Sequence, residues 1–384
     1  MSSFAKSADC IVIGAGIAGA SAAYELGRCG ASVVLLEAED EPGYHSTGRS
    51  AALFCESRGN AVVRALARAS RAFLEAPPAS FGETESFLSP ARGALHIARE
   101  DQLSDLAAAV EDLGHASPSI QLRDAEFARQ RVPALRSEVV HACLWDPDAR
   151  EIDVHALLHG YLRGARRLGG RLVTGARVTE MARADSAWRV TTTQGDFAAK
   201  LVVNAAGAWA DEVGALAGAT RIALTPRRRN AGVLHPSREG SVREWSAVFD
   251  IAGQFYFKPD VDNLLISPED EHPSAPCDAR PDETAIAVAV DRIGRVADIE
   301  FSTKPIASWA GLRSFVADEA PVVGCDPRVD GFVWVAAQGG SGIKTAPAIA
   351  RCVAAIAAGR PVPDDVLAEG VAVSDLSPTR LGPA

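Results

Sequence analysis

The chain has 384 residues and carries 39 Lys plus Arg against 49 Asp plus Glu, which gives a formal net charge of −10. With 47% hydrophobic and 23% charged residues, its composition is that of a globular protein long enough for roughly two or three domain-sized cores. The acidic balance argues against a general nucleic-acid surface, because phosphate binding draws its affinity from clustered Lys and Arg.

Neither a membrane segment nor a metal site is indicated by the sequence. No stretch reaches the roughly 18 unbroken apolar residues that a spanning helix needs, and residues 1–9 lack the features of a secretory signal. We therefore expect a cytoplasmic protein. The seven cysteines form no CxxC pair, which argues against disulfides and zinc. His155 and His159 are spaced i, i+4 but without an HExxH glutamate, so we expect a helix face there and no metal.

A βαβ unit is the first predicted structure along the chain. The β-branched run at residues 9–13 ends in the glycines of a GxGxxG motif, and an Ala-rich segment to Leu26 repeats at helical spacing. Gly30 ends this helix, and residues 31–37 resume as a second buried strand. The unit is about thirty residues long, as in dinucleotide-binding folds.

The glycines of this motif have separate predicted roles. Gly14 permits the tight turn, Gly16 lets the backbone approach a pyrophosphate, and Gly19 lets the helix pack closely on its strand. The start of the helix offers free N–H groups and a positive dipole end to phosphate. Glu37, at the end of the second strand, is placed to accept hydrogen bonds from a ribose.

The middle of the chain alternates predicted helices and strands. We predict helices over 61–74, 101–113 and 152–167. Strand-like runs separated by Gly or Asp turns indicate a small antiparallel layer at 170–174, 177–181, 187–193 and 197–200. A buried strand is predicted next, at 201–207, and alternating strands continue over 227–301 with a turn-rich acidic insert at 268–282.

The last third of the chain carries a second glycine element. Residues 331–345 read as a buried strand, a glycine nest from Gly339 to Gly342, and the start of a helix. Two glycine elements at opposite ends of the chain, with no second GxGxxG, indicate one extended dinucleotide in one domain. This favours FAD, whose ring system could lie against the second nest, where a helix dipole stabilises negative charge.

Several long stretches together resemble a known group of flavoproteins. Over essentially its full length, the sequence resembles the glycine oxidase and D-amino-acid oxidase superfamily of FAD enzymes, and within it the bacterial D-arginine dehydrogenases. The stretches that carry the resemblance are 14–19, 43–52, 161–164, 203–209, 255–260, 309–318 and 334–340.

The resemblance implies a fold and a reaction. The fold is α/β, with a discontinuous Rossmann-like FAD-binding domain and an inserted, β-sheet-rich substrate domain. The FAD domain would comprise residues 1–84, 146–220 and 309–384, and the substrate domain 85–145 and 221–308. The reaction would be the oxidation of a D-amino acid, in which hydride passes from the α-carbon to flavin N5 and water hydrolyses the imine to a 2-oxo acid and ammonia.

The resemblance also assigns roles to residues. Arg313 and Arg229 match carboxylate-binding arginines, whose planar guanidinium gives a bidentate clamp, and Tyr256 matches a tyrosine that closes the pocket. Together with the glycine motifs, it predicts a set of FAD-binding residues: Gly14, Gly16, Ile17, Ala18, Gly19, Glu37, Ala38, His45, Ser46, Thr47, Arg49, Ser50, Ala51, Val178, Ala206, Gly207, Trp209, Arg313, Gly339, Gly340, Ser341, Gly342, Ile343, Lys344 and Thr345.

The substrate pocket departs from that of the D-arginine dehydrogenases. Gly340 is expected in the pocket, and a His, Thr and Tyr that shape it in those enzymes fall here on Leu53, Cys55 and Arg58. The acid that pairs with the substrate guanidinium falls on Gly93. Because an unpaired buried cation is costly, we expect the enzyme not to be arginine-selective and strongly cationic substrates to be poor.

Other features stay open from the sequence. No cysteine lies in the stretch 309–317, where some sarcosine-oxidase relatives attach flavin, so noncovalent FAD is expected. Secondary amines or 2-hydroxy acids are alternative substrates, because the same arginine clamp would serve them. A flavin subunit of a larger redox complex is a further alternative. The electron acceptor would be a quinone, another carrier or oxygen, and a monomer is a plausible state.

Overall fold

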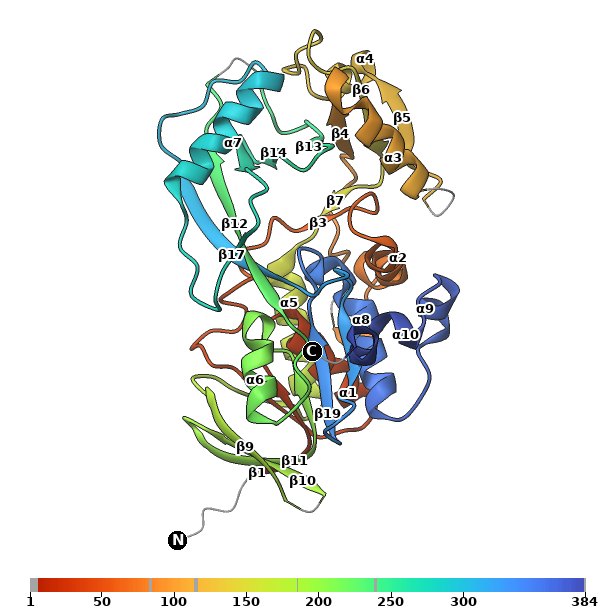
Figure 1. Cartoon of the computed structure of the whole chain (residues 1–384), viewed down its shortest axis with the longest axis vertical. Coiled ribbons are helices and arrows are strands. Elements are labelled where there is room, and N and C mark those ends of the chain that lie inside the picture. The colour runs from red at the N-terminus through yellow and green to blue at the C-terminus, as the bar shows by residue number, and fades with distance from the viewer. Residues whose placement is uncertain (1–5, 83–84, 114–116, 185, 238–239, 383–384) are drawn as a thin grey trace.

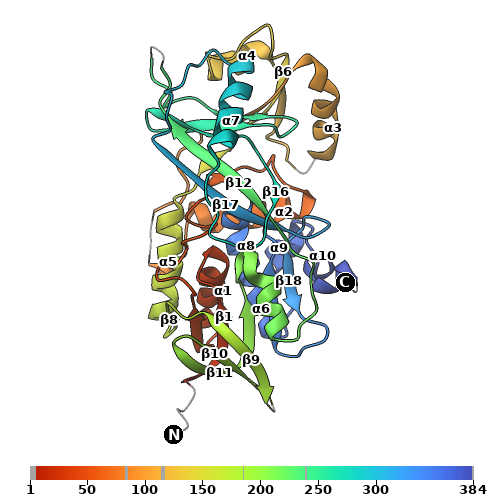
Figure 2. The same ribbon diagram turned by 60° about the vertical axis from the view of Figure 1, so that its left-hand side comes forward.

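The computed structural model describes residues 6–82, 85–113, 117–184, 186–237 and 240–382. Two large sheets organise this part of the chain, one in the lower part of Figure 1 and one in the upper part. The strands β12 (Thr225–Leu234) and β17 (Ala307–Phe315) run between the two parts (Figure 2). Segments from both ends of the chain meet in the lower part.

The first sheet contains the predicted βαβ unit. Its strands follow the order β18-β19-β11-β1-β2-β8, and all neighbours along this path are parallel except β18 with β19. The unit itself is β1 (Lys6–Ile13), α1 (Ile17–Arg28) and β2 (Val33–Leu36). The others are β8 (Arg171–Val173), β11 (Gly195–Asn204), β18 (Val322–Cys325) and β19 (Phe332–Ala336). The sequence prediction of this unit is confirmed.

Both faces of this sheet are covered. Cys10 and Val12 of β1 pack into one core cluster, and Ile11 and Ile13 into another, because successive side chains of a strand point to opposite faces. Against the first face pack α1, α2 (Ala61–Glu75), α5 (Val154–Arg167) and α8 (Gly342–Ala357). Against the second lies α6 (Ala210–Leu216). The hydrophobic runs of the sequence therefore predict buried strands correctly.

A small antiparallel layer extends β11. The strands β9 (Val178–Ala184) and β10 (Ala187–Thr192) pair antiparallel with each other, and β10 pairs with the first half of β11. The predicted antiparallel layer is confirmed for three of its four runs. The first run, residues 170–174, is β8 instead, which pairs parallel with β2 at the edge of the large sheet. The last of the four runs and the buried strand predicted after it are one continuous strand.

The second sheet has nine strands in the order β16-β12-β15-β14-β13-β4-β6-β5, with β17 paired to β12. Besides β12 and β17, its strands are β4 (Ala94–Ala98), β5 (Gln121–Asp124), β6 (Ala142–Asp146), β13 (Ala247–Asp250), β14 (Tyr256–Asp260), β15 (Asn263–Ser267) and β16 (His272–Pro273). Helices α3 (Leu103–Leu113), α4 (Ala125–Arg131) and α7 (Glu283–Val296) accompany it.

One element of this region corrects the sequence prediction. Residues 283–296 form helix α7 and not a strand. Ile286, Ala289, Ile293 and Val296 are its buried residues, spaced three and four apart as on one helix face. Asp282 caps the helix by accepting a hydrogen bond from the Thr284 N–H at 2.9 Å.

A short sheet, two tail helices and several 3₁₀ turns complete the described part of the chain. A two-stranded sheet pairs β3 (Leu53–Phe54) with β7 (Arg150–Glu151). The tail forms α9 (Asp364–Ala368) and α10 (Val373–Leu376), and the 3₁₀ turns are Ala79–Phe81, Glu100–Gln102, Gly207–Trp209 and Pro378–Leu381. Since β17 belongs to the second sheet, the boundary expected at residue 309 falls inside that strand; the division into domains stays a prediction.

Candidate active site

Two cavities meet where the carboxyl end of β1 approaches β17. The first lies between the two sheets, and the second lies beside β2 and α6. Gly16, Ser46, Thr47, Ala205 and Gly207 line both of them. An extended ligand could therefore occupy both cavities.

The glycines of the first turn leave no room for side chains. Gly14 has φ +98°, and a Cβ there would lie 2.4 Å from the carbonyl oxygen of Ala205. A Cβ on Gly19 would lie 1.8 Å from the carbonyl oxygen of Gly14, so Gly19 sets the close packing of the turn and does not line either cavity. A Cβ on Gly16 would lie 3.1 Å from the Thr47 hydroxyl. The three roles expected of the motif are consistent with this geometry.

Two helix N-termini open on the first cavity. The N-cap residues of α1 and α8, Gly16 and Ser341, line it, and neither makes a side-chain cap hydrogen bond. Uncapped helix starts present N–H groups and a partial positive charge. Thr47 accepts a hydrogen bond from the Ile17 N–H at 3.0 Å, which ties the segment 43–52 to the start of α1. The pair of helices suits a ligand that carries negative charge along its length.

Glu37 holds the turn together and faces the second cavity. Its Oε2 accepts the Ala15 N–H at 2.7 Å, and its Oε1 accepts the Glu39 N–H at 3.0 Å. Each carboxylate oxygen retains a further lone pair for a hydroxyl donor. Ala38 and Val178 line the same cavity.

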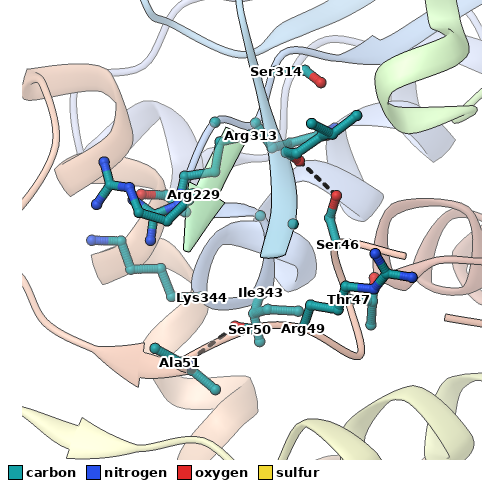
Figure 3. Close-up of a pocket in the computed structure, with 18 of the residues that line it drawn as sticks. Ser46, Thr47, Arg49, Ser50, Ala51, Arg229, Arg313, Ser314, Ile343 and Lys344 are labelled. Carbon is teal, nitrogen blue, oxygen red and sulfur yellow. Dashed lines mark hydrogen bonds between the residues drawn. The ribbon is translucent and has the colours of Figure 1, made fainter. Parts of the chain in front are cut away.

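Polar side chains of the segment after β2 line the cavities and also form hydrogen bonds within the protein. His45 Nε2 lies 3.0 Å from Glu39 Oε1, and its ring packs against Trp209 with centroids 4.6 Å apart. Ser46 donates to the carbonyl oxygen of Leu312 at 2.6 Å (Figure 3). Arg49 Nη2 donates to Asp278 Oδ1 at 2.5 Å, so this cavity residue also anchors the acidic insert.

The second glycine element lines the first cavity from Gly339 to Lys344. A Cβ on Gly340 would lie 2.8 Å from Arg313 Nη1, so this glycine lets the guanidinium pass close to the backbone. The buried Gln338 Nε2 has no hydrogen-bond partner in the described part of the chain. Thr345 does not line the cavity; its hydroxyl donates to the carbonyl oxygen of Ser341 at 2.9 Å.

Lys344 is buried beside the cavity. Its Nζ donates to the carbonyl oxygens of Cys55 and Arg58 at 2.7 and 2.8 Å. Burial, with the nearby Arg58 guanidinium adding to the effect, lowers the pKa of Lys344 to about 8. Lys344 thus fixes the main chain of segment 55–58, a role that the sequence did not indicate.

The two arginines expected to bind a carboxylate differ in their surroundings. Arg229 is buried, and each of its three nitrogens has a partner: Nε donates to the Asp270 carbonyl at 2.7 Å, Nη2 to Glu271 at 2.6 Å, and Nη1 to Glu269 at 3.3 Å. Arg313 has no hydrogen bond or ion pair among the described residues. Figure 3 shows Arg229, Arg313 and Lys344 on one side of the cavity in that view. Burial and the neighbouring Arg229 lower the pKa of Arg313 to about 10, so it stays charged near neutral pH.

The first cavity also contains an acid that no sequence motif indicates. Glu269 lines it, and its side chain is only 2% exposed. Its Oε1 accepts Arg58 Nη2 at 2.5 Å as well as Arg229, whereas its Oε2 has no partner in the described structure. Glu269 belongs to the acidic insert, and no sequence motif distinguishes it from the exposed acidic residues there. Its φ of +52°, uncommon for a residue other than glycine, appears only in the structure.

A buried polar network lies behind Cys55. Asp146 Oδ2 accepts from the Cys55 thiol at 3.3 Å and from two backbone N–H groups, and the Ser57 hydroxyl lies 2.7 Å from His96 Nε2. Burial and the Asp146 carboxylate raise the pKa of Cys55 to about 12, so the thiol is not a nucleophile near neutral pH. Burial lowers the pKa of His96 to about 3, helped by the Arg58 and Lys344 charges. Neither His96 nor Asp146 was singled out in the sequence.

The structure brings most of the predicted site residues together. Tyr256, Leu53, Cys55, Arg58, Arg229 and Arg313 line the first cavity, and all but Gly19 and Thr345 of the predicted FAD-binding set line one cavity or the other. Gly93 does not. The ring of Trp145 covers it so closely that a Cβ there would lie 1.9 Å from a ring carbon, so an acid could not occupy that position. In the described parts of the chain, no group of three His, Cys, Asp or Glu residues could hold a metal ion.

The fold and the cavities define an α/β dinucleotide-binding protein with a cationic site between its two sheets. A family model described as "DAO: FAD dependent oxidoreductase" matches residues 9–356, and the chain belongs to this family. Its cofactor is FAD and it is an oxidoreductase. The residues present fit this group. Neither N-cap residue covers its helix start with a side-chain hydrogen bond, the turn glycines leave no side chain in the way, and Gln338 Nε2 has no acceptor among the described residues.

Individual relatives extend the comparison. Mitochondrial dimethylglycine dehydrogenase of Homo sapiens is 29% identical over 265 residues, which are 68% of this chain and 30% of that protein. The chain thus spans less than a third of this relative's length. Glycine oxidase from Geobacillus kaustophilus superposes with a TM-score of 0.81 at 22% identity, covering 92% of this chain and 95% of the other. L-proline dehydrogenase from P. horikoshii superposes with a TM-score of 0.81 at 21% identity, covering 98% of this chain and 98% of the other.

These comparisons support the superfamily resemblance and the α/β fold. The closer resemblance to the D-arginine dehydrogenases, the noncovalent attachment of FAD and the site for each residue stay predictions. No helix in the described ranges is both long and apolar enough to span a membrane.

Proposed function

We propose that this chain oxidises the Cα–N bond of small α-amino acids, with D-amino acids as the substrate class. The observation that carries the proposal is the Arg313 guanidinium, which lines the first cavity beside Gly340 and has no protein partner in the described residues. Arg313 is half-buried, and its positive charge has no carboxylate beside it; a substrate carboxylate would satisfy the guanidinium with two parallel hydrogen bonds. The preference for the D enantiomer rests on the sequence resemblance.

The residues that would hold FAD divide by cavity. Around the first turn of α1, Gly14, Gly16 and Ala18 would receive the pyrophosphate, and Glu37 would receive a ribose. The segment from Gly339 to Lys344 would face the ring system. When bound, FAD supplies the two-electron acceptor for the oxidation.

The protein's own part is to bind and orient the substrate. Arg313 would hold the carboxylate, and this fixes where the α-carbon lies. Tyr256, which is buried and packs against Phe249 with ring centroids 5.4 Å apart, would close over the substrate. Arg229 would hold this wall in place through Glu269 and Glu271 and would not itself bind the substrate carboxylate, because these two carboxylates already compensate its charge. Loss of the α-hydrogen with its electron pair from a neutral amine leaves an iminium cation. Water then hydrolyses this iminium to a 2-oxo acid and ammonium.

N-substituted amino acids are the second candidate class. Dimethylglycine dehydrogenase, the human relative over 265 residues, is named for a substrate with a tertiary amine and a carboxylate. The same Arg313 clamp would serve such a substrate. A chain that works only as the flavin subunit of a larger complex would show neither activity when isolated.

A single panel tests the proposal. The FAD-loaded protein is mixed anaerobically with D-amino acids, L-amino acids, N-methylated amino acids and 2-hydroxy acids, and the visible spectrum of the flavin is recorded. Loss of absorbance with D-amino acids supports the first class, and loss only with N-methylated amino acids supports the second. No loss with any amino acid would overturn the proposal. Admission of air, or addition of a quinone, then separates oxygen from a carrier as the acceptor.

A further inference from the structure

The wall of the first cavity contains a complete guanidinium–carboxylate pair made by the protein itself. Arg58 Nη2 donates to Glu269 Oε1 at 2.5 Å, and the Arg58 guanidinium lies 4.5 Å from the centroid of the Phe249 ring. Arg58, Phe249 and Glu269 line the same cavity as Arg313 and Tyr256. One-third of the Arg58 side chain is exposed, whereas that of Glu269 is 2% exposed. Of the two paired groups that line the cavity, Arg58 is thus the more exposed.

Glu269 is held in place independently of Arg58. Its backbone N–H donates to the Ser267 hydroxyl at 3.2 Å, and Arg229 contacts the same Oε1 from β12. Its Oε2 has no partner in the described structure. A buried carboxylate with an unused oxygen binds cations, because each added donor offsets part of its desolvation. Without Arg58, the carboxylate would still be fixed and would face the cavity.

We propose that Arg58 determines substrate specificity by occupying, as an internal ligand, the place where Glu269 would otherwise bind a cationic substrate side chain. This inference rests on the proposed function for the identity of the substrate. In the wild-type protein, Arg58 fills the space beside Glu269 and adds a positive charge there, so short or uncharged side chains are accepted and cationic ones are rejected. The sequence predicts poor use of cationic substrates because Gly93 replaces an acid. In this proposal the cause is the Arg58 guanidinium instead.

The first test is a kinetic ratio measured on the FAD-loaded enzyme. D-lysine and D-norleucine have similar length but differ in the terminal ammonium, so the ratio of their kcat/KM values reports charge. Arg58→Ala is expected to raise the lysine-to-norleucine ratio by at least about 30-fold, the effect of supplying a buried charge with its partner. Addition of Glu269→Gln to Arg58→Ala should return the ratio to within about threefold of the wild-type value.

Two outcomes would overturn the inference. One is a ratio that changes by less than about threefold in Arg58→Ala, and the other is a gain for lysine that persists in the double variant. Arg243→Ala is the matched control, since it removes an arginine from an exposed pair with Asp262 and should leave the ratio unchanged. Should Arg58→Ala not fold, Arg58→Met keeps the contact with Phe249, removes the charge, and is expected to shift the ratio in the same direction.

A second readout does not depend on oxidation. 6-Aminohexanoate and hexanoate share a carboxylate for Arg313, but only the first carries a terminal ammonium. Calorimetric titration is expected to show hexanoate binding more tightly to the wild type and 6-aminohexanoate binding more tightly to Arg58→Ala. An unchanged order of affinity would contradict the role of Arg58. Failure of the wild type to oxidise any amino acid, with the order of affinity reversed as expected, would overturn the proposed function alone.

Discussion

The two halves of the site recognise their ligands by different means. The cofactor half is built mainly from backbone: a turn of glycines, two helix starts whose N-cap residues make no side-chain cap hydrogen bond, and the Gly339 segment. The substrate half is built from charged side chains on β12, β17, the segment after β3 and the acidic insert. Backbone geometry constrains the residue type at each position of the cofactor half. In the substrate half, different combinations of charged residues could line the cavity. Differences between relatives are therefore expected in the second half.

The largest expected effect comes from the backbone half. Gly14→Ala would place a Cβ 2.4 Å from the carbonyl oxygen of Ala205, and we expect FAD affinity to fall by at least about 100-fold as the turn shifts. Gly30→Ala is the matched control. Gly30 also has positive φ, at +87°, but nothing lies within 4 Å of its Cβ position. It should lose about 1–2 kcal/mol of stability with no change in affinity. Equal FAD affinities, measured by titration of the two variants, would contradict the account.

The substrate half should respond most strongly at Arg313. Arg313→Met removes the one cavity guanidinium without a protein partner among the described residues, and kcat/KM for amino acids should fall about 10²- to 10³-fold while FAD still binds. Arg228→Met provides the comparison, because Arg228 lies on β12 opposite Leu312 but does not line the cavity. If the two variants lose activity to the same extent, Arg313 does not hold the carboxylate.

A smaller effect is expected from the buried network behind Cys55. The pKa of His96 is lowered to about 3 by burial, whereas the unfolded chain protonates near 6.5. Between these values the unfolded state binds the extra proton, so the free energy of unfolding decreases as pH falls. From pH 6.5 to 5 this histidine should account for about 2 kcal/mol. Denaturant titrations of wild type and His96→Gln at both pH values check this: the variant should have the shallower pH dependence, and parallel profiles would show that His96 is not buried neutral.

The smallest effect concerns a side chain within the backbone half. Glu37→Gln exchanges charge-assisted hydrogen bonds to the Ala15 and Glu39 N–H groups for neutral ones, and FAD affinity should fall about tenfold. Substrate KM should stay constant at saturating FAD. FAD affinity is measured by titration and substrate KM by steady-state kinetics. A change in KM without a change in FAD affinity would show that Glu37 acts on the substrate and not on FAD.

The sequence predicts the cofactor half better than the substrate half, because the cofactor half depends on short-range spacing and the substrate half on contacts between distant residues. The turn at Gly14, the helix start and Glu37 lie within one short βαβ unit, so their spacing alone locates them. Glu269 meets Arg58 across 211 positions of the chain, and no local pattern marks that pair. Helix α7 was missed because its apolar residues lie in a run that also suits strands. Arg229 was expected to be a free clamp, and only the structure shows that Glu269 and Glu271 already bind it.

D-Alanine and ethylamine share an amine and a methyl group, but only D-alanine carries a carboxylate for Arg313. Each is mixed anaerobically with the FAD-loaded protein while the flavin spectrum is followed. We predict that D-alanine bleaches the flavin and that ethylamine at the same concentration does not. Equal bleaching by both compounds would show that carboxylate binding at Arg313 does not govern the reaction.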